Sequence, residues 1–115
     1  MRSKLGDKIR LQHIKESIDE IYKYIFETDF NTFINNSMMR FACVKQLEII
    51  GEASNHISDE IKLKFFEIEW NQITGMRYVF VHEYFGIDST IVWQIIKDDL
   101  PALKEKIDLI LNTLD

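Results

Sequence analysis

The spacing of hydrophobic residues predicts helices along the whole chain. Between residues 7 and 26, apolar side chains recur every three or four positions and would form one stripe along a helix. The stripe consists of Leu11, Ile14, Ile18, Ile21 and Ile25. Asp7 is expected to be the N-cap of this helix or an acidic residue of its first turn. A polar break follows at residues 28–36, and its apolar residues, Phe30, Phe33 and Ile34, are expected to fold back onto the core.

A second helix is predicted over residues 37–57, with Ser37 as its N-cap. One broad face of it carries Met39, Ala42, Cys43, Leu47, Ile49, Ile50, Ala53 and Ile57. A narrow stripe opposite carries Lys45, Glu48, Glu52 and His56. Ser58 and Asp59 then open a short charged helix that is expected to end near Phe66.

The helix predicted over residues 70–85 has no polar face. Between Trp70 and Ile87, Arg77 and Glu83 are the only formally charged residues, and apolar or aromatic residues occur all the way round. A helix that is apolar on every side is buried on every side. Since one side would face the core of a small bundle, the other side needs a partner, most simply a second copy of the chain. We therefore expect a homodimer with this helix at its interface.

The C-terminal part of the chain predicts the last helices. Gly86 is expected to be a C-cap and Asp88 the N-cap of the next helix. An apolar stripe follows, made of Ile91, Val92, Ile95, Leu100, Leu103, Ile107, Ile110, Leu111 and Leu114. Asp98, Asp99 and Pro101 mark a place where one helix stops and another starts, or where a long helix kinks. The chain is thus predicted to be all-α, an antiparallel bundle of four to five helices in a single domain over residues 1–115.

Composition narrows the possible functions. Four glycines and one proline leave little material for tight turns, and no apolar run approaches the roughly 18 residues of a membrane span. The single cysteine, Cys43, excludes an intrachain disulfide and indicates a reducing, cytoplasmic setting. No pair of histidines has the spacing of a metal site, so we expect neither a metal nor a cofactor. The formal net charge of −5 argues against general binding of nucleic acid.

Two residues of the apolar helix carry candidate chemistry. Arg77 lies in an apolar arc, cannot lose its charge and is costly to bury alone. It either belongs to a binding site or forms a structural ion pair with Glu52 or Glu48. His82 can exchange a proton near neutral pH, or can simply pack. Because five positions correspond to about 140° of rotation, Arg77 and His82 converge only if the helix ends near His82 or if two copies face each other. His13 and His56 lie on charged faces and are expected to be exposed.

The segment around these residues resembles the signature of HepT-like toxins of the HEPN superfamily. Its sequence is Gly-Met-Arg-Tyr-Val-Phe-Val-His-Glu-Tyr-Phe-Gly-Ile-Asp over residues 75–88. The family motif is arginine, four residues, histidine, any residue, tyrosine, which Arg77, His82 and Tyr84 match. The resemblance extends to Leu-Glu-Ile-Ile-Gly-Glu-Ala at residues 47–53, to Trp70, and to Asp-Asp-Leu-Pro-Ala-Leu at residues 98–103. One position departs from it: Tyr78 follows the arginine, where the family commonly has a small polar residue, often asparagine.

The resemblance implies a function. It implies an all-α homodimer whose two motifs meet in an interface cleft and cleave RNA, either tRNA or mRNA, without a metal ion, as the toxin of a type II toxin–antitoxin system. Arg77 and His82 would be catalytic, with Tyr78 and Glu52 in support. The implied partner is an MntA-type nucleotidyltransferase antitoxin, which would silence the toxin by AMPylation of Tyr84. An alternative is a non-catalytic nucleotide- or protein-binding subunit of a nucleotidyltransferase complex, in which Arg77 would hold an ATP phosphate or a partner carboxylate. A purely structural helical dimer is the third possibility.

Overall fold

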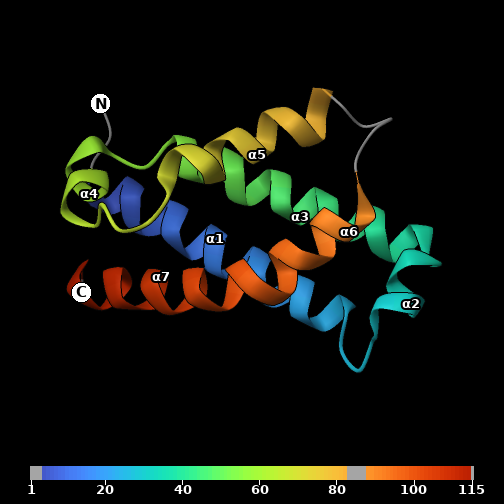
Figure 1. Ribbon diagram of the computed structural model, residues 1–115. Helices are drawn as coiled ribbons and strands as arrows, with labels where there is room; N and C mark the ends of the chain where they lie inside the picture. Colours follow the sequence, from blue (N-terminus) through green and yellow to red (C-terminus); the bar gives the residue numbers. More distant parts are fainter. Residues whose placement is uncertain (1–3, 83–87, 115) are drawn as a thin grey trace.

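Long helices make up most of the chain in the computed structural model (Figure 1). The structure describes residues 4–82 and 88–114, and within this part it describes only the backbone of residues 77–82. The helices are α1 (Lys4–Tyr24), α2 (Phe30–Ile34), α3 (Ser37–Asn55), α4 (Asp59–Lys64), α5 (Trp70–His82), α6 (Ser89–Gln94) and α7 (Leu100–Leu114), with a π-helical segment, Ile95–Asp99, between α6 and α7. The described residues include no strand. The predicted all-α class is therefore confirmed.

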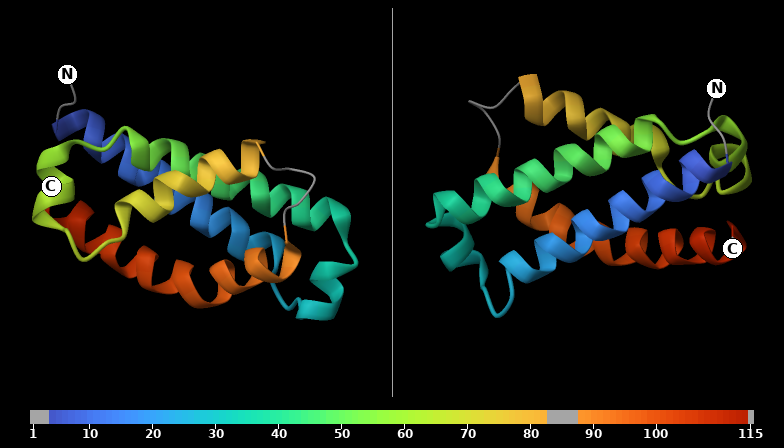
Figure 2. Two further views of the ribbon diagram at one scale, coloured as in Figure 1. Left: turned by 45° about the horizontal axis from the view of Figure 1, so that its top comes forward. Right: turned by 180° about the vertical axis from the view of Figure 1, so that it is seen from behind.

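The four long helices run alternately up and down (Figures 1 and 2). The helix α1 packs between α3 and α7, and α5 packs along α3. The short helix α4 lies at the end of the bundle that holds the start of α1, whereas α2 and α6 lie toward the other end. This arrangement confirms the antiparallel bundle. In the part of the chain that is described, no helix has the length and apolar character needed to cross a membrane.

The core is built from the apolar stripes that the sequence predicts. All five residues of the first predicted stripe are buried, four in α1 and Ile25 just after it, together with Cys43, Leu47 and Ile50 of α3 and Ile107 and Ile110 of α7. Outside the core, the Lys104 ammonium lies 2.7 Å from the Asp19 carboxylate, and the Lys15 ammonium lies 3.0 Å from that of Asp108. These partly exposed pairs link α1 to α7 and each contribute about 0–1 kcal/mol of stability.

The helix starts show which capping predictions are correct. Ser58 caps α4 and Asp88 caps α6, as expected. The prediction of Ser37 as the cap of α3 is wrong, since Ser37 is already helical and the side chain of Asn36 accepts a hydrogen bond from the Met39 amide at 3.0 Å. Asn36 has the extended backbone of an N-cap residue, and a short side chain with a carbonyl oxygen serves as well there as a hydroxyl. Gly86 lies outside the described residues.

The boundaries of α1 also differ from the prediction. It begins at Lys4, three residues before the predicted start, and ends at Tyr24, two residues before the predicted end. Near its start, the Arg10 guanidinium donates a hydrogen bond to the Gly6 carbonyl, one turn earlier, at 3.2 Å. After its end, Glu27 adopts a left-handed φ of 57°, which a regular helix does not allow.

Pro101 neither ends a helix nor starts an isolated one. The π-helical segment Ile95–Asp99 precedes it and runs directly into α7. The amide of Leu100 donates to the carbonyl of Ile95, five residues back. In a regular α-helix the Pro101 ring would meet the carbonyl of Lys97, and the wider turn relieves this clash.

An aromatic cluster fixes α2 against α6. The ring of Trp93 lies 4.9 Å from that of Phe33 and 6.1 Å from that of Phe30, measured between centroids, and the Lys97 ammonium lies 5.3 Å from the Trp93 centroid. Phe33 is fully buried, as expected. Phe30 and Ile34, which were expected to fold back with it, remain 37% and 38% exposed. The cluster anchors the helix that follows the Tyr84 segment.

Candidate functional site

The two candidate catalytic residues lie on one helix. Arg77 and His82 both belong to α5, which packs on α3, and their side chains are outside the described part of the structure. The same holds for the side chain of Tyr78. Tyr84 lies outside the described residues altogether.

The inward side of α5 is defined by its first turns. Trp70 is 6% exposed, and its indole N–H donates to the Phe65 carbonyl at 3.0 Å. Ile73 packs partly buried against the core. Because Arg77 follows Trp70 by seven residues and Ile73 by four, its backbone position lies on this inward side.

The opposite side of α5 is exposed over its first turns, where the side chains are described. Asn71 and Gly75 are exposed, and a Cβ added at Gly75 would meet no other described heavy atom within 4 Å. His82 follows Gly75 by seven residues, so its backbone position lies on the same side of the helix as Gly75. The expected separation of Arg77 and His82 around the helix therefore applies to α5, and a site that uses both residues needs more than one face of this helix.

The acidic residues considered as partners of Arg77 have other partners within α3 or at its C-cap. The Glu52 carboxylate lies 3.0 Å from His56 Nε2, and the Glu48 carboxylate lies 3.6 Å from Lys45 Nζ. All four belong to the charged stripe predicted for residues 37–57, and in the structure they lie in contact as two neighbouring pairs. The predicted ion pair of Arg77 with Glu48 or Glu52 involves the Arg77 side chain, which lies outside the described part of the structure. Half of the Glu52 side chain is exposed, 51%, so it is accessible from solvent.

Other reactive groups are accounted for by packing. Cys43 is fully buried, as the sequence predicts, and this burial raises the pKa of its thiol to about 11. It is therefore not a nucleophile at neutral pH. Among the described residues, no three His, Cys, Asp or Glu side chains come together as a metal site would require.

A family model and several known proteins that are similar to this chain point to the same family. The family model "Ribonuclease HepT-like" matches residues 14–110. The chain is 39% identical to "Putative RNase MJ1380" of Methanocaldococcus jannaschii over 94% of its own length and 99% of that protein. It is 37% identical to "Probable ribonuclease HepT" of Thermococcus cleftensis over 91% of its own length and 96% of that protein. No solved structure matches the chain.

The matched region contains α3, α5 and α6 in full, and with them Glu52, Arg77, His82 and Tyr84. The family match thus spans the residues on which the resemblance rests, and it reaches into α7 past Pro101. The chain belongs to the HepT-like ribonuclease family.

Proposed function

We propose that this chain is an endoribonuclease toxin whose active site forms between two copies of the chain. The observation that carries this proposal is the Arg77-x4-His82-x-Tyr84 motif on and after α5, in a chain of the HepT-like ribonuclease family. The names of the two relatives given above support ribonuclease activity in general.

The residue types suit RNA cleavage without a metal ion. The RNA 2′-oxygen attacks the adjacent phosphorus, the bond from phosphorus to the 5′-oxygen breaks, and a 2′,3′-cyclic phosphate forms. One His82 takes the proton of the 2′-hydroxyl and a second His82 gives a proton to the leaving oxygen, which is worth about 10²–10⁴-fold for such catalysis. Arg77 offers a permanent forked charge to the phosphorane oxygens.

The side of α5 that carries Gly75, the Gly75 stripe, supports a two-chain site. The backbone positions of Arg77 and His82 lie about 140° apart around the helix, so one copy has difficulty presenting both to one phosphate. A second α5 packed along the Gly75 stripe brings the two His82 positions close to each other. The lack of a side chain at Gly75 lets the two helices approach closely, and a two-fold axis makes the contact self-complementary.

Regulation by a cognate nucleotidyltransferase belongs to the same proposal. Tyr84 lies two residues after His82, and AMP attached to its oxygen would add bulk and one negative charge beside Arg77. That charge competes with the RNA phosphate for the guanidinium and so stops cleavage.

Substitution of His82 tests the proposal. Purified His82→Ala is expected to lose at least 10²-fold in the rate of RNA cleavage and to lose growth toxicity on expression, because proton transfer is lost. The matched control is His13→Ala, since His13 is exposed on the charged face of α1. Sedimentation of both variants checks that the assembly is unchanged. Cleavage by His82→Ala at the wild-type rate would refute the catalytic assignment.

A further inference from the structure

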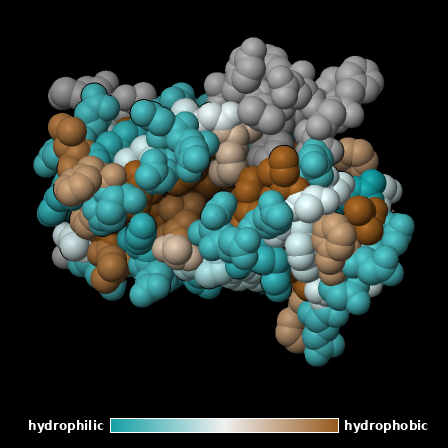
Figure 3. All heavy atoms as spheres, viewed as in Figure 1, coloured by the Kyte–Doolittle hydropathy of each residue, from teal (hydrophilic) through white to brown (hydrophobic). Residues whose placement is uncertain are grey.

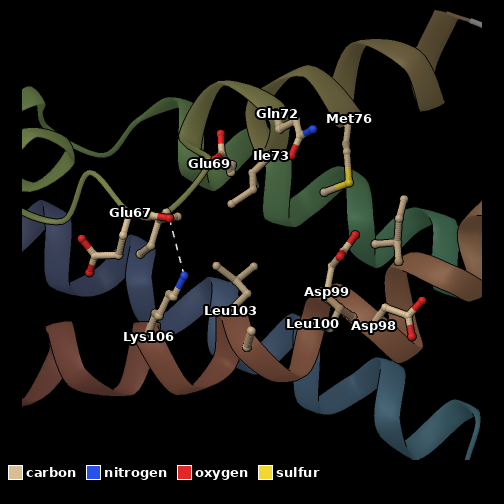
Figure 4. A pocket seen from close by; sticks show the side chains of 13 residues that line it. Glu67, Glu69, Gln72, Ile73, Met76, Asp98, Asp99, Leu100, Leu103 and Lys106 are labelled. Carbon is tan, nitrogen blue, oxygen red and sulfur yellow. Dashed lines mark hydrogen bonds between the residues drawn. The ribbon is translucent and has the colours of Figure 1, made fainter.

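A groove separates α5 from α7. While α5 packs along α3 and α7 packs along α1, α5 and α7 are not a closely packed pair. Between them lies a cavity of about 400 Å³, lined by the segment that leads into α5, by α5 itself, by the π-helical segment and by α7 (Figure 4). Its size falls within the range of about 300–1,000 Å³ that is typical of ligand sites.

The floor of the groove is apolar. Ile73 and Met76 of α5 face Leu100 and Leu103 of α7 across it. Figure 3 shows a hollow on this face of the molecule in which hydrophobic atoms lie, with hydrophilic atoms around it. Apolar surface of this kind is favourable to cover, at about 25 cal/mol per Å². The floor therefore suits a partner that brings apolar side chains.

The rim of the groove is acidic on both long sides. Glu67 and Glu69 lie on the side of α5, and Asp98 and Asp99 lie on the side of α7. All four are exposed, and Asp99 points across toward Met76 (Figure 4). One lysine, Lys106, also lines the groove, and its ammonium donates to the Glu67 carbonyl at 3.5 Å. The lining thus carries four carboxylates against one ammonium.

This charge pattern decides between possible occupants. RNA is repelled, because its phosphates would meet the carboxylates on both sides. A second copy that placed the same groove on this one would bring like charges together, which costs several kcal/mol. A segment with apolar residues on one face and lysines or arginines on either side complements both the floor and the rim.

We propose that this groove, the α5–α7 groove, is a docking site for a basic amphipathic helix of a partner protein. Its apolar residues fill the space over Met76 and Leu103, and its flanking cations pair with Glu69 and Asp99. This is the helix-in-groove mode of recognition, in which anchors recur every three or four residues.

The groove lies next to the proposed catalytic residues in the chain, so a bound partner would contact the helix that carries them. Met76 directly precedes Arg77 in the chain, and Ile73 lies one turn before it on α5. A helix bound in the groove would therefore contact the helix that carries the proposed catalytic residues, on the side away from the Gly75 stripe. Docking in this groove would give the proposed toxin a surface for a partner protein. Binding of a helix in the groove can be measured without RNA cleavage.

A binding experiment without RNA tests the proposal. The probe is a short fluorescent helical peptide with leucines at positions i and i+4 and lysines on both flanks, and its binding to the full chain is followed by anisotropy. Glu69→Lys with Asp99→Lys is expected to weaken binding about tenfold or more and to abolish its salt dependence. Ala102→Gln is expected to weaken binding as well, because Ala102 is exposed and lines the groove.

Matched controls separate the groove from general attraction to an acidic protein. Glu105→Lys changes the same kind of charge on α7, at an exposed position outside the groove, and is expected to leave the affinity within about twofold. A peptide with serines in place of the leucines, and one with glutamates in place of the lysines, are expected not to bind. Equal binding of either peptide, or an equal loss with Glu105→Lys, would overturn the proposal.

A second copy of this chain is the competing occupant. The start of α1 carries exposed Leu5 and Ile9 next to Lys4 and Lys8, which is also an apolar and basic helix surface. If the groove variants change the sedimentation of the chain in the absence of peptide, while Leu5→Gln does the same, the groove binds another copy and the partner proposal fails. Unchanged sedimentation, together with groove-dependent peptide binding, supports it.

Discussion

The carboxylate of Asp7 accepts two hydrogen bonds from Ser58. The Ser58 amide donates at 2.9 Å to one carboxylate oxygen, and the Ser58 hydroxyl donates at 2.6 Å to the other. Asp7 is 4% exposed in the first turn of α1, and Ser58 is the N-cap of α4, where its hydroxyl oxygen accepts from the Ile61 amide at 3.4 Å. One buried carboxylate thus ties the start of α1 to the helix that leads into α5.

Removal of this carboxylate should destabilise the fold. Asp7→Ala leaves the partly buried Ser58 amide without its acceptor and is expected to lower the free energy of unfolding by about 1–3 kcal/mol. Urea unfolding followed by circular dichroism measures the loss. The control is Glu16→Ala, an exposed acidic residue on the same helix, which is expected to stay within about 0.5 kcal/mol of the wild type. Equal midpoints for the two variants would contradict this role of Asp7.

The Asp7 contact also shows where sequence reasoning reaches its limit. Local rules place Asp7 correctly near the start of α1, because a first-turn acid follows from helix geometry alone. Its partner Ser58 lies 51 residues later, and no local pattern links them. Pro101 is a second such case: a proline at this place predicts a stop or a kink, and the sequence pattern does not distinguish these outcomes from the π-helical turn that leads directly into α7.

Burial of Cys43 makes a pH-dependent prediction. The pKa of its thiol rises from 9.0 to about 11 in the folded chain because burial disfavours the thiolate. In the unfolded chain the thiol ionises near 9, so the stability that the neutral buried thiol contributes is present below that pH and is lost as pH rises from about 9 to about 11.

Two measurements check the Cys43 prediction. The free energy of unfolding of the wild type should fall relative to that of Cys43→Ala over this alkaline range, and iodoacetamide should modify Cys43 at pH 8 only after unfolding. The Cys43→Ala variant shares every other titrating group, so it is the reference at each pH. A constant difference between the two proteins, or rapid alkylation of the native chain, would contradict the burial argument.

The candidate site and the groove differ in how far sequence could predict them. Arg77, His82 and Tyr84 are close in the chain, so their spacing alone is informative. The α5–α7 groove is lined by both Glu69 and Asp99, which are distant in sequence and come to line one cavity only through the packing of the bundle. The acidic residues at 67, 69, 98 and 99 are visible in the sequence, but their positions on either side of an apolar floor follow from tertiary packing.

Chelation of metal ions should not stop RNA cleavage. In the proposed mechanism His82 moves the protons and Arg77 supplies the charge, so no step requires a bound cation. Cleavage rates measured after dialysis against EDTA should equal those before it, within about twofold, when the ionic strength is held constant. A ribonuclease with a known magnesium requirement serves as the positive control. Strong inhibition that added magnesium reverses would refute the metal-independent mechanism.

Modification of Tyr84 by a cognate nucleotidyltransferase should switch cleavage off. The Tyr84 oxygen attacks the α-phosphorus of ATP, pyrophosphate leaves, and the hydroxyl proton passes to a base on the enzyme. With ATP and the partner present, mass spectrometry of the wild type should show one AMP on the peptide that contains Tyr84, and cleavage should fall with the extent of modification because, in the proposed mechanism, the added negative charge competes with the RNA phosphate for Arg77. Tyr84→Phe is expected to accept no AMP and to keep cleaving in the presence of the partner.

Tyr78→Phe, which changes the other tyrosine of the motif segment, is expected to accept AMP as the wild type does. An AMP on Tyr78 alone, or full cleavage by the modified wild type, would show that silencing does not act through Tyr84.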